Sequence, residues 1–286
     1  MIELNDKNLD EEFRRIFHGR GLQNKYKTVT IDSIDNILFV QFFDDEKIEI
    51  IDYLKEYIKT SRHNTLITKK RLTNEIKAII GEIPNNAIAI ENGIKFKLNF
   101  YNQNIGYFGD MKNSRKYIEN ISKNKKVLNL FSYTCGFSLF AKRGGATEII
   151  NMDMSKKAIS IGMKNHSINN FDMKNVLFWP HNILKSFSKI KKSSPYDIII
   201  IDPPTNQTNF IAKNDYFKIV KRLDIFSHED TIVLACLNSP DYDESYLIEL
   251  LENNSNFIFD TRIENPKEYQ NDEDSDLKSL VFRQRI

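Results

Sequence analysis

The stretch VLNLFSYTCGF, residues 127–137, decides the fold of this 286-residue chain. Its apolar run up to Leu130 is typical of a strand that is buried on both faces of a parallel sheet, and Gly136 then opens a helical segment. A turn that binds a dinucleotide at this place needs glycines, so that the pyrophosphate can approach the helix N-terminus. This turn has Phe131, Tyr133 and Cys135 instead. It therefore favours a ligand without a diphosphate and argues against an NAD-dependent oxidoreductase.

Strands and helices alternate around this stretch. Five short apolar runs are separated by helical segments, which predicts an α/β fold with a Rossmann-like doubly wound sheet and a ligand edge at the carboxyl ends of its strands. The runs are KVLNLF, EIINMD, NVLFW, YDIIIID and TIVLAC. Ser155, which precedes the helix after the second run, is expected to be its N-cap.

The first hundred residues predict a small mixed α/β domain in front of that sheet. We expect limits of 1–86 for this domain, 87–105 for a β-hairpin connection and 106–286 for the sheet domain. Within the small domain the sequence predicts a helix over Asp10–Phe17, strand hairpins at Asp35–Asn36 and Asn92–Gly93, an amphipathic helix from Ile48 to Ile58, a strand over 64–70, and a polar helical piece after it.

Composition excludes several classes of protein. The chain is 41% hydrophobic and 28% charged, as expected for a globular protein. A formal net charge of +2 gives no general argument for a polyanionic partner, so any nucleic-acid surface must be local. Two cysteines are too few for a disulfide scaffold, and no stretch has the length of a signal peptide or a membrane span. We expect a cytoplasmic protein with no membrane segment and no metal site.

Polar residues follow the first three strands of the predicted sheet and suit a nucleoside ligand. Asn129 stands at the end of the first strand, and Asp153 ends the second, a position from which a carboxylate can accept both ribose hydroxyls. After the third strand, Asn182 is placed for an adenine amino group, with Trp179 or Pro180 as apolar cover. Two plainer interpretations stay open: Asp153 as a helix N-cap, and an ordinary loop around a buried tryptophan.

The loop after the fourth strand gives the sharpest signal. Asp202, Pro203, Pro204 and Thr205 directly follow a fully apolar run. Two prolines cannot extend a central strand, and they hold the neighbouring carbonyls and Thr205 rigidly outward. A stiff loop with acceptor groups is suited to hold the edge of a planar base. The alternative is that the prolines only terminate the strand.

These segments resemble a known family, the class I S-adenosylmethionine-dependent methyltransferases, and specifically the bacterial 23S ribosomal RNA methyltransferases that modify cytosine C5 or guanine N7. VLNLFSYTCGFSLFAKRGGA is similar to the family segment around FSYTGGF, DPPT to its DPPK, DPPS or DPPT, and NIGYFGDMKNSR to its TGFFLDQR segment. The resemblance covers residues 87–245. FRRIFHGRG resembles the shorter members that lack a PUA domain. The resemblance to this family implies S-adenosylmethionine as cofactor and a ribosomal RNA base as substrate.

The resemblance also implies a set of site residues. Those expected to bind the cofactor are Asp110, Lys112, Arg115, Asn129, Phe131, Ser132, Tyr133, Gly136, Asp153, Met154, Asn182 and Asp202. Those expected to act on the substrate are Asp202, Pro203, Pro204, Thr205 and Asn238. Three positions depart from the family pattern: Cys135 replaces a glycine, Lys112 an arginine, and Asn182 a common aspartate. These changes weaken hydrogen bonding to adenine more than they threaten binding as a whole.

Two chemistries are open for the methyl acceptor. Guanine N7 has a lone pair and needs no covalent help, whereas cytosine C5 requires a cysteine thiolate to add to the ring. Cys236 is the candidate thiol, but it falls about one residue early against the family segment, which favours a buried structural role. Asn238 and Ser239 are better placed to contact the base, and Cys135 is expected to pack beside the cofactor.

Other functions remain as alternatives. The fold could serve as a catalytically inactive nucleoside- or RNA-binding scaffold, or methylate DNA, a protein or a small molecule. His18 with Arg14, Arg15 and Arg20 forms either an RNA contact patch or a solvated basic helix end. The sequence does not decide whether the N-terminal domain binds RNA or forms a homodimer.

Overall fold

The computed structural model describes residues 2–7, 10–20, 24–204, 206–207, 210–270 and 277–285. The chain forms two compact units. The first comprises Met1–Asp110 with Pro266–Asp274, and the second Met111–Asn265 with Ser275–Ile286. The domain limits expected from the sequence stay predictions, and they did not include the return of residues 266–274 to the first unit.

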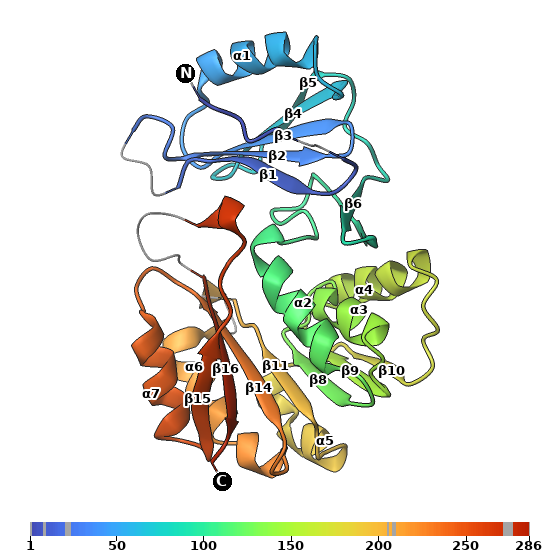
Figure 1. The fold of residues 1–286 in the computed structure, drawn as a ribbon, viewed down its shortest axis with the longest axis vertical. Coiled ribbons are helices and arrows are strands. Elements are labelled where there is room, and N and C mark those ends of the chain that lie inside the picture. Colours follow the sequence, from blue (N-terminus) through green and yellow to red (C-terminus); the bar gives the residue numbers. More distant parts are fainter. Residues whose placement is uncertain are drawn as a thin grey trace. The chain divides into compact units, whose positions relative to one another are not determined.

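The first unit is built on a five-stranded sheet of order β1-β2-β3-β4-β5, in which only β3 and β4 are parallel. Helix α1 connects these two strands and packs Ile50 and Leu54 into the core with Val40 and Leu66 (Figure 1). The elements of this unit are β1 (Arg14–His18), β2 (Val29–Ile34), β3 (Ile37–Phe42), α1 (Ile48–Ile58), β4 (Thr65–Lys70), β5 (Ile76–Ile80), β6 (Ile88–Glu91), β7 (Ile94–Lys97), η1 (Gly109–Met111, at its boundary) and η4 (Lys267–Tyr269).

Two helices expected in the first unit are wrong. The residues from Arg14 form strand β1 because they pair with β2, and the Arg15 guanidinium forms an ion pair with the Asp32 carboxylate of that strand. The polar piece after Lys70 contains strand β5, antiparallel to β4. Both hairpins are confirmed, by the pairing of β2 with β3 and of β6 with β7.

The second unit is built on a seven-stranded sheet of order β10-β9-β8-β11-β14-β16-β15. The first five strands are parallel, and β16 runs antiparallel to both β14 and β15. This confirms the predicted Rossmann-like α/β fold, although β15 and β16 were not predicted. The elements are α2 (Lys112–Ile121), β8 (Lys126–Leu130), α3 (Gly136–Arg143), β9 (Glu148–Met152), α4 (Lys156–Ile168), β10 (Val176–Trp179), η2 (Ile183–Lys185), α5 (Phe187–Lys192), β11 (Ile198–Ile201), β12 (Asn206–Gln207), β13 (Phe210–Ile211), α6 (Ala212–Val220), η3 (Leu223–Ile225), β14 (Ile232–Asn238), α7 (Glu244–Glu252), β15 (Phe257–Arg262) and β16 (Leu277–Gln284).

Helices cover both faces of the seven-stranded sheet. One face, with Leu128 and Leu130, packs against α5, α6 and α7, and the other, with Val127, packs against α2 and α3 (Figure 1). Strand β11 consists of four isoleucines that are all fully buried, as expected for a strand in the middle of a doubly covered sheet.

A membrane-crossing helix is absent from the described part of the chain, where every helix is too short or too polar to span a bilayer.

Candidate functional site

The four adjacent parallel strands β10, β9, β8 and β11 end at the same edge of the sheet. Leu130 of β8 is level with Met152 of β9 and with Ile201 of β11, and Met152 is level with Trp179 of β10. The loops that leave these strand ends therefore begin side by side. The structure thus brings together the segments that the sequence singled out after each strand.

The loop after β8 has an unusual backbone. Phe131, Tyr133 and Cys135 have φ angles of 55°, 46° and 63°. A residue with a side chain costs about 1–2 kcal/mol in this left-handed region. Strain of this kind persists where the surroundings hold it and clusters at functional sites. Here the Ser132 amide donates to the Met152 carbonyl at 3.0 Å, which ties the loop to the end of β9.

Asp153 joins the loops after β8 and β9. Its Oδ2 accepts a hydrogen bond from the Tyr133 amide at 2.9 Å, and its Oδ1 accepts one from the Ser155 amide at 2.8 Å. Burial raises the pKa of this carboxyl above its ordinary value, while the two backbone donors act in the opposite direction. Asp153 is not the N-cap of α4. That role belongs to Ser155, as predicted, whose hydroxyl accepts from the Ala158 amide at 3.1 Å.

A buried hydrogen-bonded chain lies behind the end of β8. The Asn129 amide donates to Asn151 at 2.9 Å, and the Asn151 amide donates to the Ser138 hydroxyl at 3.0 Å. Ser138 lies 2.9 Å from His166 Nε2, and His166 Nδ1 lies 2.8 Å from the Gly162 carbonyl. Since a carbonyl only accepts, Nδ1 carries the proton and Nε2 accepts from Ser138. Burial lowers the pKa of His166, in keeping with this neutral form.

This series of hydrogen bonds ends at an acceptor that has no donor among the described residues. Asn129 Oδ1 is buried and has no hydrogen-bond partner within the described part of the molecule. A buried acceptor without a hydrogen bond is rare in proteins, which indicates that a donor from outside the described residues, such as a ligand or a water, binds there. The sequence analysis found Asn129 but missed Asn151, Ser138 and His166. Polar residues at otherwise apolar core positions of β9, α3 and α4 were the available signal.

The Cys135 side chain is inert. It is fully buried and lies against Gly162 of α4, where a Cβ atom would come within 2.3 Å of its sulfur. Burial raises the pKa of the thiol to about 12. At neutral pH the group is therefore protonated and cannot act as a nucleophile.

The ends of β11 and β14 form the other side of the site. Asp202 and Pro204 are half-buried and Pro203 is buried after β11, while Thr205 lies outside the described residues. At the end of β14, Asn238 is exposed and Ser239 is buried.

Tyr216 of α6 holds these two strand ends. Its hydroxyl lies 3.4 Å from the Ile201 carbonyl and 3.3 Å from the Cys236 carbonyl, so its one proton bridges β11 and β14. Burial raises the pKa of Tyr216 well above its ordinary value. The sequence analysis missed this residue, although a lone tyrosine on the buried side of a helix was a usable signal.

Cys236 is enclosed in the core. Its side chain is fully buried among the residues that face α2 and α3, and its sulfur lies 3.8 Å from the Ser279 hydroxyl. One strand further, Lys278 is also buried and donates to the Ser239 carbonyl at 2.8 Å. The turn that follows β14 is thus held from β16.

The predicted adenine contacts lie just beyond β10. Asn182 Oδ1 accepts from the Lys185 amide at 3.2 Å and so caps η2. Trp179 is half-buried, and the Lys189 ammonium stands 4.3 Å from the centre of its ring. Met154, after β9, is 45% exposed.

The remaining predicted residues lie near the boundary of the two units. Asp110 falls in η1 of the first unit, whereas Lys112 and Arg115 belong to α2 of the second, where Arg115 is buried with its guanidinium 5.9 Å from the centre of the Phe140 ring. Their joint role in one pocket stays a prediction. In the first unit, the Arg15 side chain is only 11% exposed, and its guanidinium carbon lies 4.6 Å from the centre of the Tyr269 ring, so for this residue the interpretation as a solvated helix end is wrong.

A family model described as S-adenosylmethionine-dependent methyltransferase matches residues 14–283. The chain belongs to this family. The match covers both units and agrees with the strand order of the larger sheet, and S-adenosylmethionine is the cofactor of this methyltransferase.

Curated relatives and solved structures agree with this assignment. The chain is similar to ribosomal RNA large subunit methyltransferase I from Aeromonas salmonicida, 33% identical over half of the chain and 37% of the relative. The enzyme of that name from Vibrio vulnificus is 32% identical over 62% of the chain and 48% of the relative. The chain thus spans less than half the length of these relatives.

Among solved structures, the fold is similar to that of SMU.776, a putative methyltransferase complexed with SAH (TM-score 0.84, 24% identity, 96% of this chain and 75% of that one). It is also similar to a methyltransferase from Agrobacterium tumefaciens (TM-score 0.71, 15% identity, 96% and 90%).

Proposed function

We propose that this methyltransferase transfers the methyl group of S-adenosylmethionine to a base of ribosomal RNA. The choice of ribosomal RNA as substrate rests on the similarity to ribosomal RNA large subunit methyltransferases over half or more of the chain. The stiff Asp202-Pro203-Pro204 segment beside the exposed Asn238 supports it, because both segments leave adjacent strands at the cofactor edge of the sheet.

The residues at the strand ends fit this cofactor. The turn after β8 offers no glycine-lined phosphate site, and S-adenosylmethionine has no phosphate at its methionine end. The buried Asn129 Oδ1 supplies an acceptor for the methionine ammonium group. Asp153 holds the ribose hydroxyls, since each of its oxygens accepts one backbone hydrogen bond and has a second lone pair for a hydroxyl.

At the adenine end, Asn182 acts together with Trp179. Asn182 Oδ1 already caps η2, so its amide NH₂ is the group best placed to donate to a ring nitrogen. Trp179 provides a half-buried apolar face for the base. When bound, the cofactor supplies an electrophilic methyl group on a sulfonium.

The acceptor atom is a base nitrogen. Methylation of cytosine C5 needs a thiolate that can reach the ring. The chain has two cysteines, and both are fully buried. Cys135 is held protonated by burial, and Cys236 packs on the face towards α2 and α3. A nitrogen with its own lone pair needs only to be placed in line with the methyl group, and such placement supplies much of the rate enhancement.

The test is methyl transfer to ribosomal RNA. Purified protein is incubated with unmodified large-subunit ribosomal RNA and labelled S-adenosylmethionine, and nucleosides from the digested RNA are identified by mass spectrometry. We expect one N-methylated purine or pyrimidine, formed equally well by Cys236→Ala. Formation of 5-methylcytidine that is lost in Cys236→Ala would overturn the nitrogen assignment. Labelling of DNA, protein or a small molecule, with none in ribosomal RNA, would overturn the substrate.

A further inference from the structure

Charged residues are distributed unevenly along the second, methyltransferase unit, and the small net charge of +2 of the whole chain does not show this. Residues 111–201 contain sixteen Lys and Arg against five Asp and Glu. Residues 202–265 with 277–285 of the same unit contain eight Lys and Arg against twelve Asp and Glu. The two parts therefore carry formal charges of +11 and −4.

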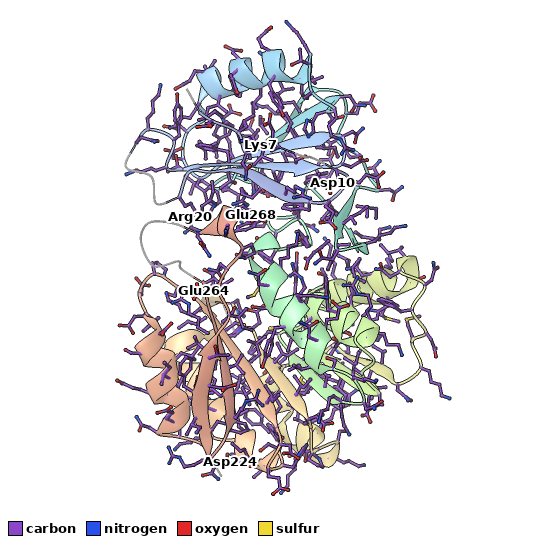
Figure 2. All side chains as sticks on the ribbon, in the orientation of Figure 1. Lys7, Asp10, Arg20, Asp224, Glu264 and Glu268 are labelled. Carbon is purple, nitrogen blue, oxygen red and sulfur yellow. The ribbon has the colours of Figure 1, made fainter. Side chains whose placement is uncertain are left out.

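This division along the sequence is also a division in space. Residues 111–201 supply β10, β9, β8 and β11, which are consecutive in the sheet, and the later residues supply β14, β16 and β15. We call these parts the basic half and the acidic half. Asp224 and Glu264, labelled in Figure 2, lie near opposite ends of β15 in the acidic half. The boundary between the halves runs between β11 and β14, where Asp202 and Asn238 stand.

The carboxylates of the basic half neutralise only part of it. Glu119 pairs with Arg143 and Lys116, Glu148 with Lys126, and Asp197 with Lys125. Within the described part of the chain no ion pair is formed by nine other lysines of this half: Lys123, Lys142, Lys156, Lys164, Lys174, Lys185, Lys189, Lys191 and Lys192.

Three of these lysines stand next to the cofactor edge. Lys156 opens α4 directly after the β9 loop, Lys185 ends η2 after β10, and Lys189 lies over Trp179. All three are exposed. We call Lys156, Lys185 and Lys189 the basic rim. Lysines without carboxylate partners are available to phosphates, and neutralising a phosphate releases condensed counterions, which favours binding.

We propose that the basic rim binds the phosphate backbone of a single-stranded RNA segment, whose target base then reaches the segments that follow β11 and β14, at Asp202 and Asn238. The acidic half repels the backbone, so the RNA lies across one half of the sheet and its direction over the site is restricted. The inference rests on the proposed function, because it names the surface on which that substrate docks.

The experiment measures RNA binding without methyl transfer. A fluorescein-labelled single-stranded RNA of 20 nucleotides is titrated with protein, and anisotropy is recorded at several salt concentrations. The test variant is Lys156→Gln with Lys185→Gln and Lys189→Gln. The matched control is Lys218→Gln with Lys221→Gln and Arg222→Gln, which removes three exposed cations from the acidic half. Both variants are also titrated with S-adenosylmethionine, whose affinity should stay within twofold of wild type.

We expect the rim variant to bind RNA about 10- to 100-fold more weakly and to lose about two units of the slope of log K against log salt, at roughly 0.7 per phosphate contact. The control should change less than threefold. Equal losses in both variants would show a dependence on net charge alone and overturn the proposal, as would no loss in the rim variant. Tighter, rim-dependent binding of a 20-base-pair DNA duplex would overturn the RNA assignment. Rim-dependent RNA binding without methylation of ribosomal RNA would contradict the proposed function and leave this surface in place.

Discussion

Gly162 and Cys135 should be energetically coupled. An added Cβ at Gly162 of α4 would lie 2.3 Å from the Cys135 sulfur and 3.0 Å from its Cβ. Overpacking a close-packed interior costs about 1–3 kcal/mol, and this contact is near the upper end of that range because both partners are buried. Replacing glycine by alanine inside a helix returns about 1 kcal/mol. We therefore expect Gly162→Ala to destabilise the second unit by about 2 kcal/mol.

The sign should reverse when the cysteine is removed. Cys135→Gly deletes the clashing sulfur and Cβ, and the next contact of the new alanine is the Thr134 carbonyl carbon at 3.4 Å, an ordinary distance. It also relieves about 1–2 kcal/mol of strain at a φ of 63°, which offsets the loss of the buried thiol. In this background Gly162→Ala should stabilise by about 1 kcal/mol. The coupling between the two sites is then about 3 kcal/mol.

Urea unfolding of the wild type, both single variants and the double variant measures this coupling directly. The tryptophan fluorescence of Trp179, the one tryptophan of the chain, reports on the second unit. Additive effects of the two substitutions, within about 0.5 kcal/mol, would refute the packing of Cys135 against α4 that supports the strained loop.

Three further predictions follow from the described contacts. Ser138→Ala should cost about 1–3 kcal/mol of stability, because His166 Nε2 loses its donor and the Asn151 amide loses the Ser138 hydroxyl as acceptor, and it should weaken S-adenosylmethionine binding several-fold in calorimetry. The matched Ser33→Ala, which breaks a 2.8 Å contact with His63, should cost a similar amount and leave cofactor affinity unchanged; equal cofactor affinities of the two variants would contradict a positioning role for Ser138. Burial lowers the pKa of His63 from 6.5 to about 4, so the unfolded chain takes up this proton at a higher pH than the folded chain. As the pH falls from 6.5 to 4, the wild type should therefore lose roughly 1–3 kcal/mol more stability than His63→Asn in paired urea titrations. Parallel pH profiles of the two proteins would argue against a lowered pKa of His63. Gly109→Ala would place a Cβ 1.9 Å from the Tyr269 hydroxyl and should lower the stability of the first unit by about 2 kcal/mol or more. Part of this stability should be recovered when Tyr269→Phe is added, because the Tyr269 hydroxyl has no hydrogen-bond partner among the described residues. If circular dichroism melting shows no recovery, the contact between Gly109 and Tyr269 is disproved.

The methyltransferase sheet was readable because its strands are continuous apolar runs. IIII over 198–201 leaves no polar face, and only a strand covered on both sides accommodates it. The antiparallel strands β15 and β16 were not predicted, because their sequences carry charges such as Arg262 and Arg283 near the strand ends. In the first unit, β1 is decided by the partner strand β2 and by the Arg15–Asp32 ion pair, which local periodicity cannot show.

The candidate site was predictable where a residue follows a strand directly. Asp153 and Asp202 were found on that ground, and both directly follow the ends of their strands at the same edge of the sheet. The side chains that hold the site escaped, because Tyr216, Ser138 and His166 act through contacts between elements far apart in the sequence. The sequence predicted Ser155 as the N-cap of α4 and left the same role open for Asp153, and the hydrogen bonds decide for Ser155.

Calorimetric titration of S-adenosylmethionine into the wild type and Asp153→Ala tests the central claim most directly. We predict saturable binding at one site, weakened by about 10-fold or more in the variant, since hydrogen bonds to a charged group contribute roughly 1.5–3 kcal/mol. Absence of binding at millimolar cofactor, or equal affinity of the two proteins, would contradict a cofactor site at the carboxyl ends of β8 and β9.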